Sequence, residues 1–346
     1  MNRIARNTAA LFGAAIFAGL SLTSGATAQG SLTVYCSVQE EWCQGMVNAF
    51  QAETGISVSM TRKSSGETYA QVAAEAANPK GDIWWGGTGD PHLQAAEEGL
   101  TEPYESPNLS QLHPWALAQH ETGKGATVGI YLGVLGYGYN TEVLKRRNLP
   151  EPKCWSDLLN AKYKDEVQVA DPNSSGTSYT MLATMVQIMG EDKGFEYLKK
   201  LHANINQYTK SGAAPAKAAA QGETLIGITF LHDLVTMAVG GAPLKLVAPC
   251  EGTGYEVGSM SIIKGGKNPK EARMWYDWAL TPEAQALGAE TKAYQIPSNT
   301  RAKVPPQAPR LDQTKVIDYD FQKYGSSAER KRLLSKWDKE VKALPK

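Results

Sequence analysis

Small hydroxyl residues and glycines gather in four short segments, each where a predicted strand gives way to a helix. N–H and O–H donors that converge without bulky side chains can bind a phosphoryl group. A helix N-terminus favours anions, because its first N–H groups have no partner in the helix. For any single segment, ordinary helix capping is the simpler interpretation. The candidate phosphate-binding residues are Ser37, Ser64, Ser65, Gly66, Thr88, Ser174, Ser175, Gly176 and Thr177.

Neighbouring side chains keep both interpretations of these segments open. Ser37 and Glu40 have the spacing of a capping box, and so do Ser64 and Glu67. The basic residues at 62–63 either add charge to a phosphate site or belong to a solvated loop. No G-x-x-x-x-G-K-[ST] motif occurs in the sequence, so the hydrolysis of nucleoside triphosphates is unsupported.

A second constellation combines an imidazole with carboxylates. His232 and Asp233 directly follow the apolar run 225–230, and Glu256 lies in a glycine-rich segment further along. These side chains are good hydrogen-bonding partners for sugar hydroxyls. The alternative is a satisfied buried histidine with a capping aspartate. The sequence has no G-x-S-x-G elbow, and its five histidines are scattered, so neither a nucleophile nor a metal cluster is predicted.

The elements that must position these residues alternate between strand and helix. Runs at 32–35, 56–60 and 82–85 are typical of strands, and the segments between them repeat apolar residues at helical spacing. The same rhythm resumes near residue 167. It predicts an α/β fold with parallel, doubly wound sheets, in which ligands bind beyond the carboxyl ends of the strands. The glycine-punctuated run 131–139 could pass from one lobe to another.

Composition limits the class of protein. The chain has 346 residues, which suggests two domains, and 42% of them are hydrophobic, as in globular proteins. Its 35 basic residues balance its 35 acidic residues, so the formal net charge is zero. A nucleic-acid binder needs a basic surplus, so nucleic acid is not an expected partner.

The N-terminus predicts export. Arg3 and Arg6 precede an apolar stretch and an A-x-A pattern that ends at Ala28, so we expect a signal peptide over residues 1–28. A transmembrane anchor is the alternative, but the stretch is short and interrupted by Gly and Ser.

The cysteines fit an exported chain. An even number of them favours disulfides, and four allow three pairings. We predict that Cys36 pairs with Cys43 and that Cys154 pairs with Cys250.

Together these features resemble a periplasmic solute-binding protein of an ABC importer, in the type II class and the ferric-iron-binding-protein group. The resemblance covers essentially the whole chain after residue 28, and it rests mainly on the order of several segments. These segments are residues 32–37 (LTVYCS), 86–90 (GGTGD), 136–140 (GYGYN), 170–172 (ADP) and 281–285 (TPEAQ).

The resemblance implies two α/β lobes, each with a mixed or parallel sheet flanked by helices. Two extended hinge crossings join the lobes, which close on a ligand. We place residues 29–128 and 254–300 in the first lobe. The second lobe would take residues 129–253 and 301–346.

The resemblance also bears on the ligand. Ferric binders of the group carry adjacent tyrosines after the strand at 225–230, whereas this chain has Leu231, His232 and Asp233 there. Tyrosinate oxygens are hard donors for Fe(III), so their absence puts iron in doubt. The site instead resembles the hexose-phosphate-binding branch. That branch implies sugar-binding roles for His232, Asp233 and Glu256, with the phosphate among the hydroxyl-rich segments.

The resemblance therefore implies a monomeric periplasmic binding protein with no metal, cofactor or catalytic residue. It would present a phosphorylated small molecule, a hexose phosphate first, to membrane permease subunits. The alternatives are a phosphonate such as 2-aminoethylphosphonate, ferric iron with an accompanying anion, and a secreted phosphatase.

Overall fold

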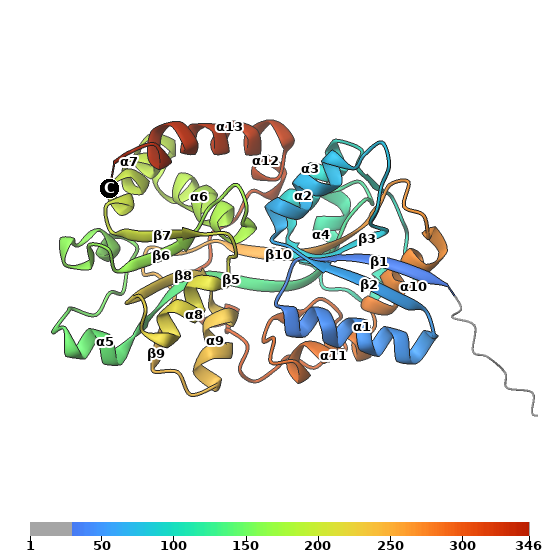
Figure 1. The fold of residues 1–346 in the computed structure, drawn as a ribbon, viewed down its shortest axis with the longest axis horizontal. Helices are drawn as coiled ribbons and strands as arrows, with labels where there is room; N and C mark the ends of the chain where they lie inside the picture. Colours follow the sequence, from blue (N-terminus) through green and yellow to red (C-terminus); the bar gives the residue numbers. More distant parts are fainter. Residues whose placement is uncertain (1–29, 346) are drawn as a thin grey trace, which may run out of the picture.

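Two α/β lobes lie side by side in the computed structural model, which describes residues 30–345 (Figure 1). The predicted signal peptide lies outside the described residues. No helix within 30–345 is both long enough and apolar enough to cross a membrane. The predicted α/β fold with two lobes is confirmed.

The sheet of the first lobe has the order β2-β1-β3-β10-β5, with two short strands at its margins. Strands β1, β2 and β3 are parallel, as predicted, and β10 runs antiparallel to β3. The strands are β1 (Ser31–Cys36), β2 (Ser57–Arg62), β3 (Ile83–Thr88), β4 (Thr101–Glu102), β10 (Tyr255–Ile263) and β11 (Ile296–Pro297).

The sheet of the second lobe has the order β5-β8-β6-β7, and β9 pairs with β5. Strand β6 is parallel to β7 and β8, whereas β5 runs antiparallel to β8 and β9. The strands are β5 (Val128–Asn140), β6 (Val167–Ala170), β7 (Ile205–Thr209), β8 (Ile226–Phe230) and β9 (Leu244–Val247).

One strand belongs to both sheets. The first half of β5 pairs with β10, up to Val134, and its second half pairs with β8 and β9 from Leu135 onward. This strand is the glycine-punctuated run of the sequence, and it serves as one crossing between the lobes. The partner change falls later in the chain than the boundary that we placed at 128/129, and the lobe limits stay a prediction.

Helices cover both faces of the two sheets (Figure 1). Those whose chain segments adjoin the strands of the first sheet are α1 (Glu40–Thr54), α2 (Ser65–Ala74), α3 (Gly89–Glu97), α4 (Pro114–Thr122), α10 (Pro269–Ala279) and α11 (Pro282–Glu290). The others are α5 (Thr141–Arg146), α6 (Gly176–Met189), α7 (Glu191–His202), α8 (Ala214–Gln221), α9 (Leu231–Val239), α12 (Phe321–Tyr324) and α13 (Ser327–Trp337).

The two C-terminal helices reach from the second lobe to the first. Arg332 of α13 binds the carboxylate of Glu191 on α7 through two guanidinium nitrogens, at 2.9 and 2.7 Å. On its other side, α13 inserts the buried side chain of Arg330, whose Nε donates to Gln94 Oε1 of α3 at 2.8 Å. The C-terminal segment therefore contacts both lobes.

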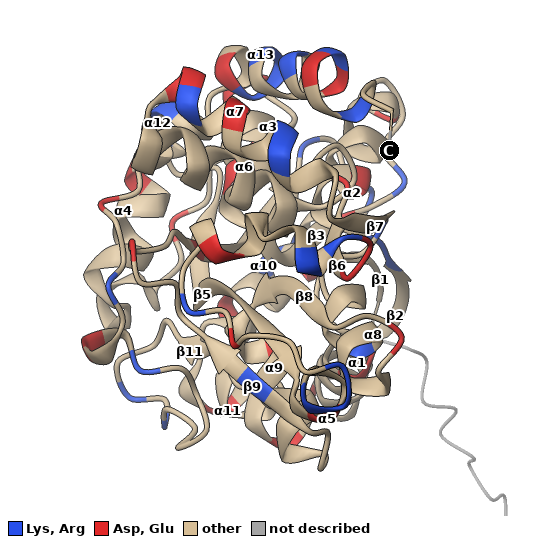
Figure 2. Ribbon diagram, turned by 90° about the vertical axis from the view of Figure 1, so that its left-hand side faces the viewer, with Lys and Arg blue, Asp and Glu red and all other residues tan. Residues whose placement is uncertain are grey.

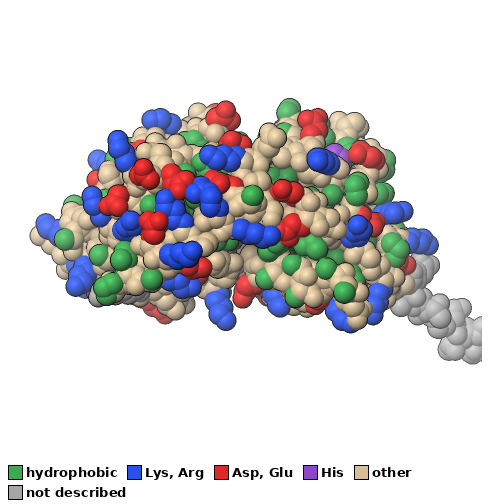
Figure 3. All heavy atoms as spheres, turned by 90° about the horizontal axis from the view of Figure 1, so that it is seen from above, with side chains coloured by type: hydrophobic (Ala, Val, Ile, Leu, Met, Phe, Trp, Pro, Cys, Tyr) green, Lys and Arg blue, Asp and Glu red, His purple; other side chains and the backbone are tan. Residues whose placement is uncertain are grey.

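Charged side chains of both signs are mixed over the surface. Acidic and basic residues alternate along α13 and its neighbours (Figure 2). The face that carries α13 shows the same mixture in the space-filling view (Figure 3). A strong field of one sign is therefore not a feature of this face, in keeping with the balanced composition.

Candidate ligand-binding site

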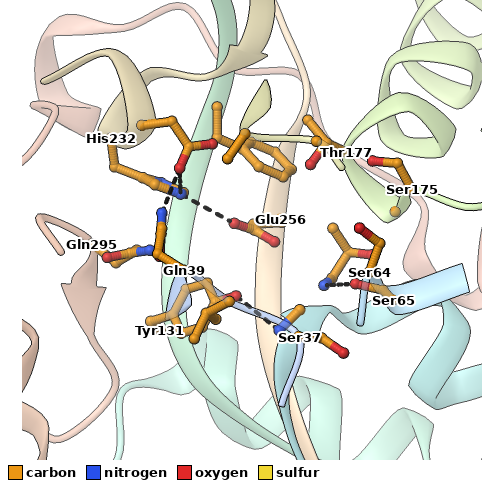
Figure 4. A pocket seen from close by; sticks show the side chains of 18 of the residues that line it. Ser37, Gln39, Ser64, Ser65, Tyr131, Ser175, Thr177, His232, Glu256 and Gln295 are labelled. Atoms are coloured by element: carbon orange, nitrogen blue, oxygen red, sulfur yellow. Dashed lines mark hydrogen bonds and ion pairs between the residues drawn. The ribbon is translucent and has the colours of Figure 1, made fainter. Parts of the chain in front are cut away.

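A cavity lies where the two lobes meet (Figure 4). Both lobes contribute to its wall, and most of the polar side chains in the wall are buried. Ten of the predicted site residues line it: Ser37, Ser64, Ser65, Thr88, Ser175, Gly176, Thr177, His232, Asp233 and Glu256.

The two other predicted residues lie just outside this wall and bind each other. The backbone N–H of Gly66 donates to the carbonyl oxygen of Ser174 at 3.0 Å, and this hydrogen bond joins α2 of the first lobe to the segment before α6. The Ser174 hydroxyl donates to the carbonyl oxygens of Asp171 and Lys210, at 3.2 and 3.0 Å. These two residues thus hold the lobes together beside the cavity.

The hydroxyl-rich end of the cavity is built at strand ends and helix N-termini. Ser64 caps α2 in a capping box with Glu67, as predicted. Ser65 Oγ accepts a hydrogen bond from the backbone N–H of Thr88 at 3.1 Å, so α2 is tied to the end of β3. The Thr88 hydroxyl is buried without a hydrogen-bonding partner in the described part of the chain. A free hydroxyl there can serve a ligand.

The predicted capping box at Ser37 is wrong. Helix α1 begins at Glu40, and its N-cap is Gln39, whose side chain makes no capping bond. Ser37 Oγ accepts instead from Trp84 Nε1 at 3.0 Å and lies 2.9 Å from Thr68 Oγ1. Because α1 begins only at Glu40, Ser37 lies outside the helix, and it lines the cavity.

The acidic end of the cavity centres on His232. His232 Nε2 lies 3.8 Å from Asp233 Oδ1 and 3.8 Å from Glu256 Oε1. Asp233 lies in the first turn of α9, and its Oδ2 accepts from Thr229 Oγ1 at 2.8 Å. Glu256 comes from β10 and points into the cavity between His232 and the hydroxyl-rich end (Figure 4). The chain turns into α9 after β8, which brings both neighbouring side chains to the same cavity.

Glycine creates the space for this trio. A Cβ atom on Gly133 of β5 would lie 2.6 Å from the imidazole of His232 and 2.8 Å from Glu256 Oε1. Such contacts are far inside van der Waals range, so a larger residue there would displace the imidazole or the carboxylate.

Burial controls the charge of these groups. It raises the pKa of Glu256 well above its ordinary value, and the neighbouring carboxylates of Asp233 and Asp90 raise it further. Burial also lowers the pKa of His232, against the opposing effect of Asp233. Near neutral pH we therefore expect an uncharged imidazole and a protonated Glu256, which can donate a hydrogen bond.

Several further residues line the wall: Tyr131, Gln39 and Gln295 were not predicted, whereas Arg62 belongs to the basic pair noted in the sequence. Tyr131 of β5 accepts from the backbone N–H of Gly87 at 3.0 Å, and burial raises its pKa, so it stays protonated. Gln39 and Gln295 each carry a buried amide oxygen without a partner among the described residues. Arg62 donates through Nε to Val38 O at 2.9 Å and through Nη2 to Ser211 Oγ at 3.3 Å.

Both predicted disulfides are present. Cys36 and Cys43 close a short loop that carries Ser37 and Gln39, and their Cα atoms are 6.1 Å apart. Cys154 and Cys250, 96 residues apart in sequence, join two segments of the second lobe. The short bridge therefore stabilises the loop that contributes to the cavity wall.

Comparison with known proteins defines the class. Residues 79–323 match the family of bacterial extracellular solute-binding proteins, and the chain belongs to this family. It is a periplasmic solute-binding protein of the kind that serves ABC transporters.

Three relatives cover nearly the whole chain. An uncharacterized protein of Haemophilus influenzae is 46% identical over 331 residues, which span 95% of this chain and 96% of that protein. The periplasmic binding protein AfuA of Actinobacillus pleuropneumoniae, solved with exogenous fructose-6-phosphate bound, is 47% identical, with a TM-score of 0.89 over 91% of this chain and all of AfuA. The periplasmic binding protein P5PA is 41% identical, with a TM-score of 0.88 over 90% of this chain and all of P5PA.

Proposed function

We propose that this protein captures a hexose phosphate between its two lobes and delivers it to the permease of an ABC importer. One observation carries the proposal. A single cavity has hydroxyl groups and helix N-termini at one end and His232, Asp233 and Glu256 at the other. A phosphorylated sugar carries the two complementary chemistries in one small molecule.

The hydroxyl-rich end suits a phosphate dianion. The N-termini of α2 and α6 lie beside the cavity, and Ser65, Ser175 and Thr177 add hydroxyl groups from both lobes. N–H groups at a helix N-terminus and hydroxyls stabilise an anion without the desolvation cost of a buried cation. At α2, the N–H groups of Gly66 and Glu67 already donate to the carbonyl oxygen of Ser174, so this helix contributes mainly its serine hydroxyls. Arg62 at the rim adds one positive charge.

The acidic end suits sugar hydroxyls. A sugar hydroxyl both donates and accepts, so it needs partners of both kinds. Asp233 accepts, a protonated Glu256 donates, and the neutral imidazole of His232 does one with each nitrogen. His232 Nδ1 is buried without a partner in the described part of the chain, which leaves it available to a ligand.

The lobes meet around the cavity, as a capture mechanism requires. The bond between Gly66 N and Ser174 O, and the bond between Arg62 and Ser211, both join one lobe to the other. A ligand that touches both lobes prefers this closed arrangement and shifts the population toward it. The closed form would then be the one that a permease recognises.

A second candidate ligand is an aminoalkylphosphonate such as 2-aminoethylphosphonate. Its phosphonate would occupy the same hydroxyl-rich end, and its ammonium group would pair with the carboxylate of Asp233. The neighbouring Glu256 favours the sugar, because a protonated carboxyl gives an ammonium group no charge to pair with.

A phosphatase is the competing proposal from another class of protein. Phosphate ester hydrolysis needs an activated nucleophile or a metal. Release of inorganic phosphate from glucose 6-phosphate by the purified protein would favour the phosphatase over the binding protein.

A thermal-shift panel tests the ligand. Binding with micromolar affinity should add about 4 kcal/mol of stability at millimolar ligand. We expect a large shift with glucose 6-phosphate or fructose 6-phosphate and little with free glucose, because the dianion is the anchor. A larger thermal shift with 2-aminoethylphosphonate or with ferric citrate than with either hexose phosphate would identify that compound as the better ligand.

A further inference from the structure

A second hollow adjoins the cavity. This groove lies between the ends of α1 and α11 on one side and α8 and α9 on the other. It shares Gln39, Arg62, Ala213 and Asp233 with the wall of the cavity. The two hollows therefore meet at these residues.

Two hydrogen bonds across the lobes lie where the hollows meet, one from Arg62 to Ser211 and one from Gln39 to Asp233. Gln39 Nε2, from the segment before α1, donates to Asp233 Oδ1 of α9. Thr229 holds the other carboxylate oxygen of Asp233 at 2.8 Å, so the acceptor is fixed in place. Further along the groove, Thr236 Oγ1 donates to the carbonyl oxygen of Lys292 at 2.7 Å and joins the lobes again.

The donor is fixed as firmly as the acceptor. Gln39 lies in the loop closed by the Cys36–Cys43 disulfide. Its carbonyl oxygen accepts from the N–H groups of Trp42 and Cys43, at 3.1 and 3.0 Å. The preceding carbonyl, of Val38, accepts from Arg62 Nε at 2.9 Å. The backbone on both sides of the Gln39 side chain is thus held in place, and the side chain has a defined direction.

The side chain of Gln39 does not stabilise the N-terminus of its own helix, α1. Gln39 is the N-cap of α1, yet it makes no capping hydrogen bond. A shorter Ser, Thr, Asp or Asn would cap the helix better. The length of Gln serves the reach to Asp233 instead.

The orientation of the proposed ligand brings one of its ends close to the hydrogen bond between Gln39 and Asp233. With the phosphate at the hydroxyl-rich end, the far end of the ligand points toward His232 and Asp233, and the groove lies beyond them. We propose that Gln39 sets the upper limit of ligand length: its amide, held against Asp233, closes the cavity toward the groove, so that phosphates of a single sugar fit and those with a second ring are excluded. This inference rests on the proposed function.

The test compares the size limit in the wild type with that in Gln39→Ser and Gln39→Ala. Both changes shorten the wall, and Ser also supplies a capping hydroxyl, so Gln39→Ser should fold at least as stably as the wild type. Gln44→Ala is the matched control, because Gln44 is an exposed residue of α1 whose side chain donates to Asn48 Oδ1 at 2.7 Å, away from the cavity wall. Calorimetric titrations would use inorganic phosphate, glucose 6-phosphate and trehalose 6-phosphate.

We expect the wild type and Gln44→Ala to bind glucose 6-phosphate at least about 100-fold more tightly than trehalose 6-phosphate. In both Gln39 variants this ratio should fall at least about 10-fold, through a gain for the two-ring ligand, while inorganic phosphate binds unchanged. A ratio that stays the same in both variants, or a wild type that binds the two ligands equally, would overturn the role of Gln39 alone. A wild type that binds no phosphorylated sugar would overturn the proposed function and this inference with it.

Discussion

The two ends of the cavity present different kinds of polar group to a ligand. The hydroxyl-rich end is made of main-chain N–H groups, serines and threonines, all from segments where a strand meets a helix. The acidic end combines ionisable side chains from helix α9 and strand β10, and burial shifts the pKa values of His232 and Glu256. The residues of the first end are grouped in short sequence segments and can be recognised there. The residues of the second end come together, and their pKa values shift, only when the chain folds.

This difference explains which site residues could be predicted. Ser64 and Glu67 form the predicted capping box because capping depends on a few neighbouring residues. The Ser37 box failed because Trp84 and Thr68, distant in sequence, engage its hydroxyl instead. Tyr131 and Gln295 lie in strand β5 and next to β11, and no local pattern distinguishes them from core residues.

The largest loss of affinity is expected when closure of the lobes at the hydroxyl-rich end is prevented. A Cβ on Gly66 would lie 2.3 Å from the backbone oxygen of Asn173 in the other lobe. Because a backbone atom cannot rotate away, Gly66→Ala should lower the affinity for glucose 6-phosphate roughly 100-fold, near the upper range for overpacking. Calorimetry measures the affinity, and small-angle scattering should show no contraction on titration.

Gly288→Ala is the control for this variant. Its new Cβ would meet nothing closer than 3.4 Å, which is ordinary van der Waals contact. If Gly66→Ala closes and binds as well as Gly288→Ala, the closed arrangement described here is not the binding form.

At the acidic end, the largest effect is expected from Asp233. Removing a charged acceptor of sugar hydroxyls costs about 1.5–3 kcal/mol, so Asp233→Ala should weaken binding of glucose 6-phosphate roughly 10- to 150-fold. Inorganic phosphate should bind the variant as it binds the wild type, since it occupies the other end. An unchanged affinity for the sugar phosphate, in a variant with normal circular dichroism, would remove Asp233 from the site.

The protonation of Glu256 predicts a pH dependence of the ligand-free protein. Burial raises the pKa of this carboxyl well above 4.5, so the folded chain holds the proton more tightly than the unfolded chain. As the pH rises above 4.5, the unfolded chain releases the proton first, and the free energy of unfolding falls.

The Glu256→Gln variant has an amide at this position, which does not titrate in this pH range. Relative to the variant, the wild type should lose stability above pH 4.5 by up to about 1.4 kcal/mol per pH unit, until the folded form also ionises. Urea unfolding at pH 5, 6, 7 and 8 measures the difference. A constant difference across this range would show that Glu256 keeps an ordinary pKa.

The smallest effect on ligand affinity is expected from Glu256→Gln. At neutral pH, Glu256→Gln replaces a protonated carboxyl with an amide of the same shape that also donates a hydrogen bond. We therefore expect the affinity for glucose 6-phosphate to change less than about threefold, well below the cost of removing a charged partner. A loss as large as that in Asp233→Ala would mean that Glu256 binds the sugar as a carboxylate.

We propose that one closed cavity binds the phosphate and the sugar of the same ligand. Calorimetric titration of the wild-type protein with glucose 6-phosphate and with glucose measures whether both groups are needed for binding. We predict binding of at least micromolar affinity for the phosphorylated sugar and no measurable heat with glucose. Equal binding of the two sugars, or binding of neither, would contradict the account.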